Sequence, residues 1–147
     1  MDLKIHLQRL VNSFRHFSGR DFIALPPNTD LVNFLHEAPF ALVSHGTEAD
    51  PIFNYANKTA QRLWEMDWDE FTSTPSRLSA EPMRREEREQ LLHQVAQFGF
   101  AENYEGIRIS KTGKRFWIRN TTVWNVLDEQ GHYIGQAASY SKWDFIE

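Results

Sequence analysis

The fold class is decided by residues 101–142, AENYEGIRISKTGKRFWIRNTTVWNVLDEQGHYIGQAASYSK. Three segments of this stretch, residues 101–110, 114–127 and 132–142, are rich in the β-branched and aromatic residues that favour strands. The sequences KTG and DEQG separate them and have the composition of hairpin turns. Because connections this short leave no room for a crossover, we expect three consecutive antiparallel strands.

Two more strands and several helices precede this stretch. Residues 40–44 and 52–55 have the composition of a strand hairpin, and Asn57 is a suitable N-cap for a short helix behind it. Residues 83–98 predict a longer helix that ends at Gly99. An amphipathic helix at the N-terminus is predicted by a stripe with helical spacing, Leu3, Leu7, Leu10 and Phe14. The order predicts an α+β fold, a five-stranded antiparallel sheet with helices on one face, preceded by an N-terminal amphipathic helix.

Composition narrows the classes of protein to consider. The chain has 147 residues, enough for one hydrophobic core, and its formal net charge of −4 argues against direct binding of nucleic acid. It contains no cysteine, so disulfides, thiolate metal sites and cysteinyl photoadducts are excluded. No run of apolar residues has the length of a membrane span or signal peptide. We expect a cytoplasmic protein that does not contact a membrane.

Several strings carry a resemblance to a known family. ALVSHG at residues 41–46 and IFNYANKTAQRLW at residues 52–64 resemble the opening hairpin and first helix of a PAS domain, and the three strands of residues 101–142 fall in the order that ends such a domain. The longer strings SHGTEADPIFNY, residues 44–55, and PSRLSAEP, residues 75–82, are similar to the MEKHLA group of PAS-like domains. The resemblance implies a PAS-like MEKHLA domain over residues 30–147, after an N-terminal helix and linker at residues 1–29.

The same resemblance implies a role in sensing or protein interaction. Members of the group occur as stand-alone bacterial proteins and as the C-terminal domain of plant homeodomain-leucine zipper regulators. This sequence has neither a homeodomain nor a zipper. The sensory or interaction role alone transfers, and we expect no enzymatic activity.

The long strand at residues 114–127 suggests where a ligand would bind. Strict alternation places Phe116, Ile118, Asn120 and Thr122 on one face, together with Trp124 and Val126. We predict that this face lines a cavity beneath the helices, and the alternative is a filled core in which Asn120 bonds to protein alone. The predicted ligand-binding residues are Phe53, Leu63, Trp64, Leu92, Val95, Ile107, Phe116, Ile118, Asn120 and Thr122.

PAS folds hold flavin, haem, small acids or nothing, so the cofactor must be argued from the site. The absence of cysteine excludes a covalent flavin adduct and leaves non-covalent flavin open. An axial haem ligand would have to come from His93, which lies beside the apolar row of its helix. We therefore do not expect haem.

A serine and a histidine at the hairpin, Ser44 and His45, invite a catalytic interpretation. Adjacent residues of a strand point to opposite faces, so these two side chains should not meet. We predict no catalytic residue and no metal site, and assign a structural role in turn and loop to His45, Gly46, Glu48, Asp50 and Asn57.

Two functions remain open. The first is a sensory domain acting in signalling, which binds a small molecule non-covalently. The second is a ligandless interaction module with a signalling protein as partner. We expect the outer sheet face to be covered by the N-terminal helix or by a second protomer. We also predict a homodimer, formed by the outer sheet face and by the apolar stripe of the N-terminal helix, Leu3, Leu7, Leu10 and Phe14.

Overall fold

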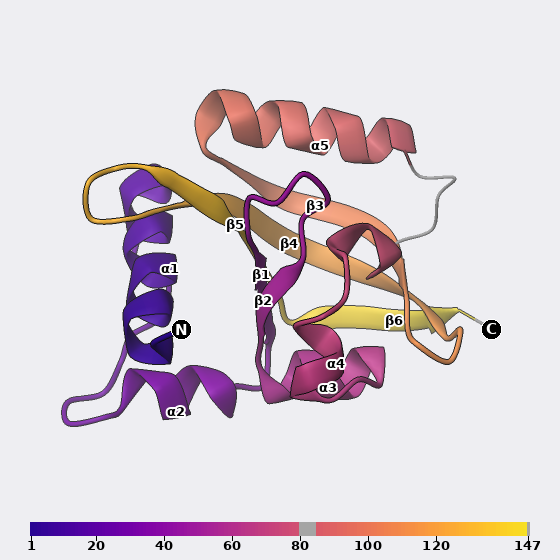
Figure 1. Cartoon of the computed structure of the whole chain (residues 1–147), viewed down its shortest axis with the longest axis horizontal. Coiled ribbons are helices and arrows are strands. Elements are labelled where there is room, and N and C mark those ends of the chain that lie inside the picture. Colours follow the sequence, from indigo (N-terminus) through magenta and orange to yellow (C-terminus); the bar gives the residue numbers. More distant parts are fainter. Residues whose placement is uncertain (80–84, 147) are drawn as a thin grey trace.

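An antiparallel sheet forms the centre of the protein. The structure is a computed structural model and describes residues 1–79 and 85–146. Its strands are β1 (Ala41–His45), β2 (Phe53–Ala56), β3 (Phe100–Ile109), β4 (Arg115–Leu127), β5 (Tyr133–Tyr140) and β6 (Lys142–Ile146). The order is β2-β1-β5-β4-β3, and β6 pairs with β4 (Figure 1). The predicted class of antiparallel sheet with helices is confirmed.

The sheet has one strand more than the sequence predicted, because β6 follows the last predicted strand, residues 132–142, after a break at Ser141. β5 pairs with the second half of β4, from Thr122 opposite Ser139, and β6 pairs with the first half, from Arg119 opposite Lys142. The register is unchanged across the break. β6 therefore continues the ladder of β5 along the length of β4.

The helices begin where short polar side chains can accept from their first free N–H groups. The helical elements are α1 (Leu3–Ser18), α2 (Leu31–His36), α3 (Lys58–Trp64), α4 (Trp68–Phe71), the 3-10 turn η1 (Ser76–Ser79) and α5 (Arg85–Phe98). Asn57 caps α3, as predicted, and Asp67 caps α4 in a capping box with Glu70. α1 ends at Gly19, whose φ of 74° is favourable for glycine. No helix in the described ranges has both the length and the apolar character to cross a membrane.

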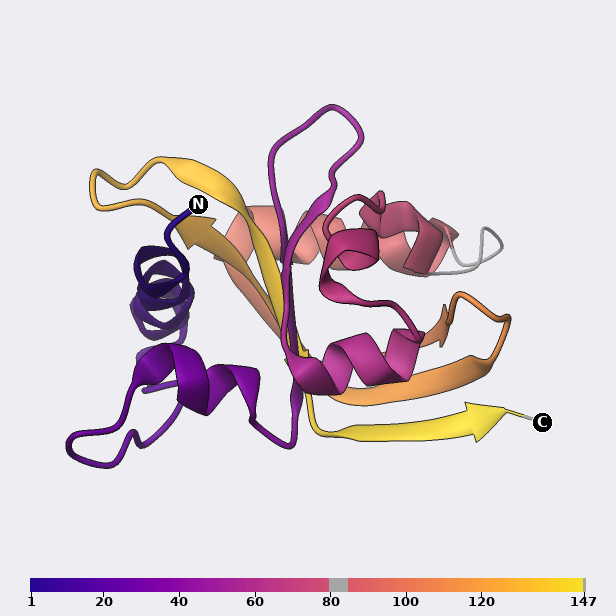
Figure 2. The ribbon, with the colours of Figure 1, turned by 60° about the horizontal axis from the view of Figure 1, so that its bottom comes forward.

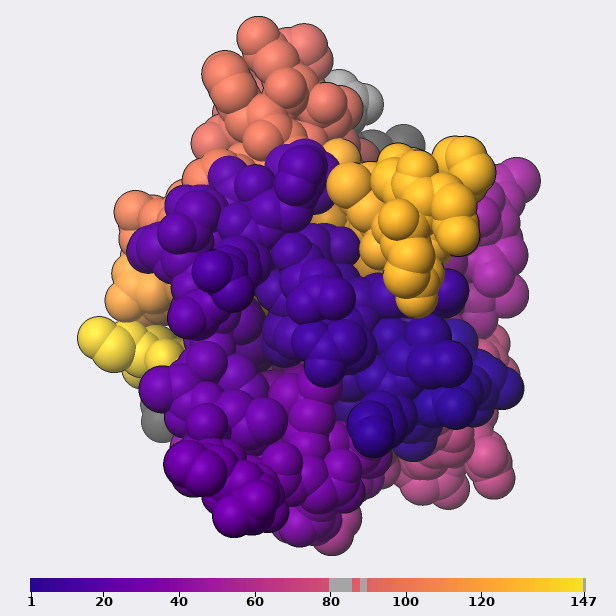
Figure 3. Space-filling view, turned by 90° about the vertical axis from the view of Figure 1, so that its left-hand side faces the viewer, coloured from indigo at the N-terminus to yellow at the C-terminus, as the bar shows by residue number. Residues whose placement is uncertain are grey.

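Helices cover both faces of the sheet (Figures 1 and 2). α3 and α5 pack on the inner face, where Trp64 contacts Phe116 and Val95 lies against Val123. α1 and α2 pack on the outer face. Figure 3 shows this side of the molecule covered by the indigo and purple N-terminal segment. The sheet thus separates two layers of apolar contacts.

The apolar stripe of α1 is the centre of the outer layer and is not a free surface. Leu7 and Leu10 are fully buried and Phe14 is 7% exposed. They form one cluster with Trp124, whose indole N–H donates to the carbonyl of Leu10 at 3.0 Å. Leu3 packs against the same cluster. The predicted homodimer through this stripe is therefore wrong, because the outer face of the same chain already occupies it.

Two β-bulges overturn the predicted alternation of β4. Tyr104 pairs with Thr121 while Gly106 pairs with Ile118, so β4 carries one extra residue between these pairs. Asn120 lies in this bulge with a φ of +50°, a conformation that asparagine tolerates better than most residues. A second bulge in β3 contains Asn103, whose φ is +58°. The faces of β4 therefore exchange at Asn120.

Candidate functional site

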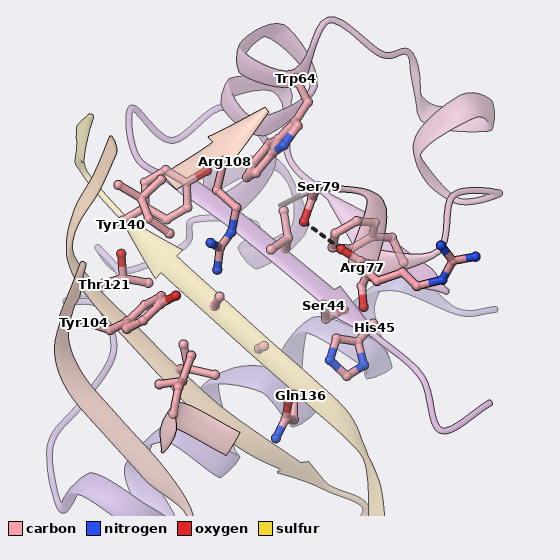
Figure 4. Close-up of a pocket in the computed structure, with 18 of the residues that line it drawn as sticks. Ser44, His45, Trp64, Arg77, Ser79, Tyr104, Arg108, Thr121, Gln136 and Tyr140 are labelled. Carbon is pink, nitrogen blue, oxygen red and sulfur yellow. Dashed lines mark hydrogen bonds between the residues drawn. The ribbon is translucent and has the colours of Figure 1, made fainter. Parts of the chain in front are cut away.

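A cavity of about 610 Å³ lies between the inner face of the sheet, η1 and α5 (Figure 4). This volume falls within the usual range of small-molecule sites, roughly 300–1,000 Å³. The wall is built from β1, β3, β4 and β5 on the sheet side and from Trp64, η1 and α5 on the helix side. The fold therefore contains a space between the sheet and the helices.

Seven of the ten predicted ligand-binding residues belong to the inner layer. Four line the cavity: Phe53, Trp64, Leu92 and Ile118. Three others are buried core residues that do not form its wall: Leu63, Val95 and Phe116. The helix and strand periodicities were sufficient to place these seven side chains on the correct side of the sheet.

Asn120 and Thr122 do not reach the cavity, which corrects the prediction. Asn120 is exposed at the bulge, and Thr122 is partly buried outside the cavity wall. Beyond the extra residue, the side chains facing inward are Thr121 and Val123. The physical reason is that one residue added to a strand moves every following side chain to the opposite face.

Ile107 was also predicted to bind the ligand, but its side chain lies outside the cavity wall. Its neighbour Arg108 lines the cavity instead. Partners across an antiparallel pair share a face. Ile107 lies opposite Trp117, whereas Arg108 lies opposite Phe116, which belongs to the inner cluster. Arg108 and not Ile107 lines the cavity (Figure 4). No pattern in the sequence indicated a charged residue at this position.

Three buried polar atoms have no hydrogen-bond partner within the part of the chain that the structure describes. They are the indole nitrogen of Trp64 and the hydroxyl oxygens of Thr121 and Tyr140. All three residues line the cavity, and each is at most 3% exposed. Burial raises the pKa of the Tyr140 hydroxyl well above its usual value, so this group stays protonated. An unpartnered buried polar group costs about 1–3 kcal/mol, so their convergence on one cavity requires an explanation.

In the described part of the cavity wall, the charged groups are two arginines. The Arg77 Nε donates to both carboxylate oxygens of Asp50, each at 3.1 Å. Arg108 donates to the carbonyl oxygen of Ile107 at 3.0 Å, and its guanidinium lies 5.6 Å from the centre of the Tyr104 ring. No aspartate or glutamate is among the described residues of the wall. The positive charge of Arg108 is therefore directed into the cavity without an acidic neighbour there.

The loop residues singled out from the sequence lie around the β1–β2 hairpin. The ring of His45 contacts the carbonyl of Gly46 at 2.9 Å, and Glu48 accepts from the backbone N–H of Ile52 at 3.2 Å. Asp50 forms the ion pair with Arg77. Asn57 is fully buried beside the start of α3. Their contacts are local hydrogen bonds and an ion pair.

Ser44 and His45 both line the cavity, and an irregularity in the β1–β2 register falls between them. The hydroxyl of Ser44 donates to the side-chain oxygen of Asn54 at 2.5 Å and contacts the ring of His6 at 2.9 Å. Ser44 and His6 are 2% and 6% exposed. Burial lowers the pKa of His6 to about 4, with a contribution from the positive charge of Arg9. The pair formed by Ser44 and His6 is therefore buried, and of the two only Ser44 also borders the cavity, among the described residues of its wall.

Neither haem nor metal ligation finds support in the placement of the histidines. His93, the one candidate for an axial ligand, is exposed on α5 and does not line the cavity. Across residues 1–79 and 85–146, no three histidine or acidic side chains gather as a metal site would require. The cavity must therefore be interpreted through its hydroxyl, indole and guanidinium groups.

Comparisons with known proteins agree with the fold. The family model of the MEKHLA domain matches residues 4–145, a range that includes α1. Among solved structures, the PAS domain of a protein from Colwellia psychrerythraea superposes with a TM-score of 0.64 at 16% identity, covering 78% of this chain and 92% of that one. A comparison with curated proteins gives no match. The resemblance inferred from the motifs is confirmed.

Two photoreceptor structures share the same fold. The light-state dimer of the fungal blue-light photoreceptor Vivid superposes with a TM-score of 0.65 at 14% identity, over 92% of this chain and 93% of that one. A light-oxygen-voltage domain studied with a flavin analogue gives 0.61 at 16% identity, over 82% and 87%. At these identities the similarity establishes the PAS fold and nothing finer.

Proposed function

The chain belongs to the MEKHLA domain family, and we propose that it is a sensory domain that binds a small molecule non-covalently in the cavity between sheet and helices. The observation that carries the proposal is the convergence of three unpartnered polar atoms, from Trp64, Thr121 and Tyr140, on the cavity. A bound molecule would supply the missing hydrogen bonds once these side chains turn toward it, since the three atoms have almost no accessible surface without it. A filled core would leave them unpaired at a cost of about 1–3 kcal/mol for each.

We propose that the cavity binds a ligand and does not catalyse a reaction. His45 is the one histidine of the cavity wall, and its ring contacts the carbonyl of Gly46. Without a carboxylate in the described wall, no acid orients this imidazole as a general base. A site of this kind can hold a molecule and report its presence through the sheet.

Flavin is one occupant that the proposal includes. The light-oxygen-voltage neighbour was studied with a flavin analogue, and a cavity of about 610 Å³ lies within the range of sites for organic cofactors. The hydroxyl and indole groups could bond to ring oxygens and nitrogens. Since the chain contains no cysteine, flavin would be held by these contacts without a covalent adduct.

The test is native mass spectrometry of the freshly purified protein, with the retained molecules identified after denaturation. We expect a stoichiometric small molecule on the wild type. The variant Ala138→Phe should lose it, since Ala138 lies on the cavity wall opposite Val123. Ala49→Phe is the matched control, because Ala49 is exposed in the hairpin loop.

The ligandless interaction module is the competing function. A wild type that carries no molecule and gains no thermal stability from a library of metabolites would refute the sensor and favour the module. Homodimerisation remains a proposal, supported by the dimeric state named for Vivid. It cannot use the buried stripe of Leu7 and Leu10, so light scattering should be combined with substitutions elsewhere.

A further inference from the structure

We infer that the molecule bound in this cavity is an organic anion, with an acidic group held at Arg108 and an apolar body against the α5 side of the wall. The inference rests on the proposed function and specifies the chemical class of its ligand. A carboxylate is the simplest acidic group of this kind, and a phosphate or sulfonate shares the same chemistry.

Charge is the first argument. In the described part of the chain, Arg108 has a carbonyl and an aromatic ring as neighbours and no carboxylate within ion-pair distance. Arg77, the other arginine of the wall, is neutralised by Asp50. Arg108 is partly buried, and a guanidinium that gives up part of its hydration gains most from an anionic partner. An acidic ligand would form the charge-assisted, bidentate contact for which arginine is suited.

Hydrogen-bond polarity is the second argument. The indole N–H of Trp64 and the guanidinium of Arg108 can donate and cannot accept. The hydroxyls of Thr121 and Tyr140 can do either, and both lack a partner. Figure 4 shows Arg108, Tyr140, Thr121 and Trp64 around one region of the cavity. A ligand group rich in acceptors, as a carboxylate is, suits Arg108 directly, and the three buried groups could bond to it once their side chains turn toward the cavity.

The remaining wall determines the body of the ligand. Apolar side chains from both layers line it: Phe53, Leu91, Leu92, Ile118 and Val123. A small inorganic anion would leave most of a cavity of about 610 Å³ unfilled and would gain nothing from this surface. The site therefore suits an acid with an aliphatic or aromatic body.

A matched pair of fluorescent probes separates the charge from the cavity. 8-Anilinonaphthalene-1-sulfonate is an aromatic anion, and N-phenyl-1-naphthylamine is its analogue without the sulfonate. We expect Arg108→Gln to raise the Kd of the anionic probe by about 10-fold or more while the Kd of the neutral probe changes by less than about 2-fold. Arg108→Lys should retain part of the anion affinity. Arg15→Gln is the control, and it should leave both constants within about 2-fold because Arg15 is exposed on α1 and does not line the cavity.

A second measurement needs no variant and covers the case in which Arg108→Gln does not fold. Decanoate should displace the neutral probe from the wild type at a concentration about 10-fold lower than 1-decanol does. Equal displacement by acid and alcohol, or an anionic probe that binds Arg108→Gln as tightly as the wild type, overturns the anion inference and leaves the cavity proposal intact. Failure of the neutral probe to bind the folded wild type refutes the ligand-binding cavity, and the anion inference with it.

Discussion

Replacing Asn57 by alanine should destabilise the protein far more than removal of an ordinary helix cap. Its amide oxygen accepts from the backbone N–H groups of Ala60 and Leu42 at 3.2 and 3.1 Å. Its amide nitrogen donates to the carbonyls of Leu35 and Phe40 at 3.0 and 2.8 Å. Asn57 is fully buried, so water cannot easily take its place. One side chain thereby joins α3, β1 and the end of α2.

The expected cost follows from these four hydrogen bonds. At about 1 kcal/mol net for each bond, Asn57→Ala should lower the free energy of unfolding by about 4 kcal/mol, a large part of the roughly 5–15 kcal/mol that a domain possesses. For a chain of this size the midpoint of thermal unfolding should fall by about 10 °C. Urea denaturation followed by circular dichroism measures both the free energy and any change in its slope.

Asp67→Ala provides the control, because Asp67 caps α4 from an exposed position. It should cost about 1 kcal/mol, the usual value of an N-cap. Asn57→Asp tests the donors separately: it retains the cap oxygen and turns a second oxygen toward the carbonyls of Leu35 and Phe40, so it should cost at least as much as alanine. Equal losses from Asn57→Ala and Asp67→Ala would refute the argument, since they would show that the bonds to β1 and α2 contribute nothing.

Three further predictions concern the outer layer and the bulge. Because burial holds the pKa of His6 at about 4 in the fold against 6.5 as its ordinary value, the unfolded chain takes up the proton first as pH falls. The contribution of neutral His6 to the free energy of unfolding should thus be fully present above pH 6.5 and should decrease by about 2–3 kcal/mol toward pH 4.5 in urea titrations. The variant His6→Gln should show a smaller decrease. Leu7→Asp with Leu10→Asp should abolish the cooperative thermal transition, because both leucines are fully buried; a folded, stable double variant would contradict the docking of α1. At Asn120, glycine should change stability by less than about 0.5 kcal/mol and valine should cost about 1–2 kcal/mol, since φ is positive there; equal effects in calorimetry would exclude the bulge.

Local patterns were sufficient for most of the elements and for part of the site. Strand composition, turn residues and the caps at Asn57 and Gly19 depend on near neighbours in the chain, so the sequence revealed them. The stripe of α1 was equally visible, and it correctly indicated a buried face. An amphipathic pattern does not say which surface covers it, however. The partner proved to be Trp124 and its neighbours, more than 100 residues away along the same chain.

The site was harder to predict because it depends on small departures from regular strands. Arg108 was missed because an isolated arginine on an edge strand is usually solvated, and two bulges precede the residue in the β3–β4 pair. The one signal available was the presence of Asn103 and Asn120 inside strands, since asparagine is depleted there and tolerates a left-handed backbone. Tyr140 and Thr121 carry no local signal, because their significance arises from the absence of partners in the folded protein.

The bulge at Asn120 also accounts for the existence of the cavity. With strict alternation from Ile118, Trp124 would point inward beside α5, and a buried indole would occupy much of the space that the ligand is proposed to fill. The extra residue sends Trp124 outward instead, where its N–H bonds to α1 and its ring packs against Phe14. The smaller side chains of Thr121 and Val123 face inward in its place. The left-handed backbone of Asn120 therefore places Trp124 in the packed outer layer and leaves space for the cavity in the inner layer.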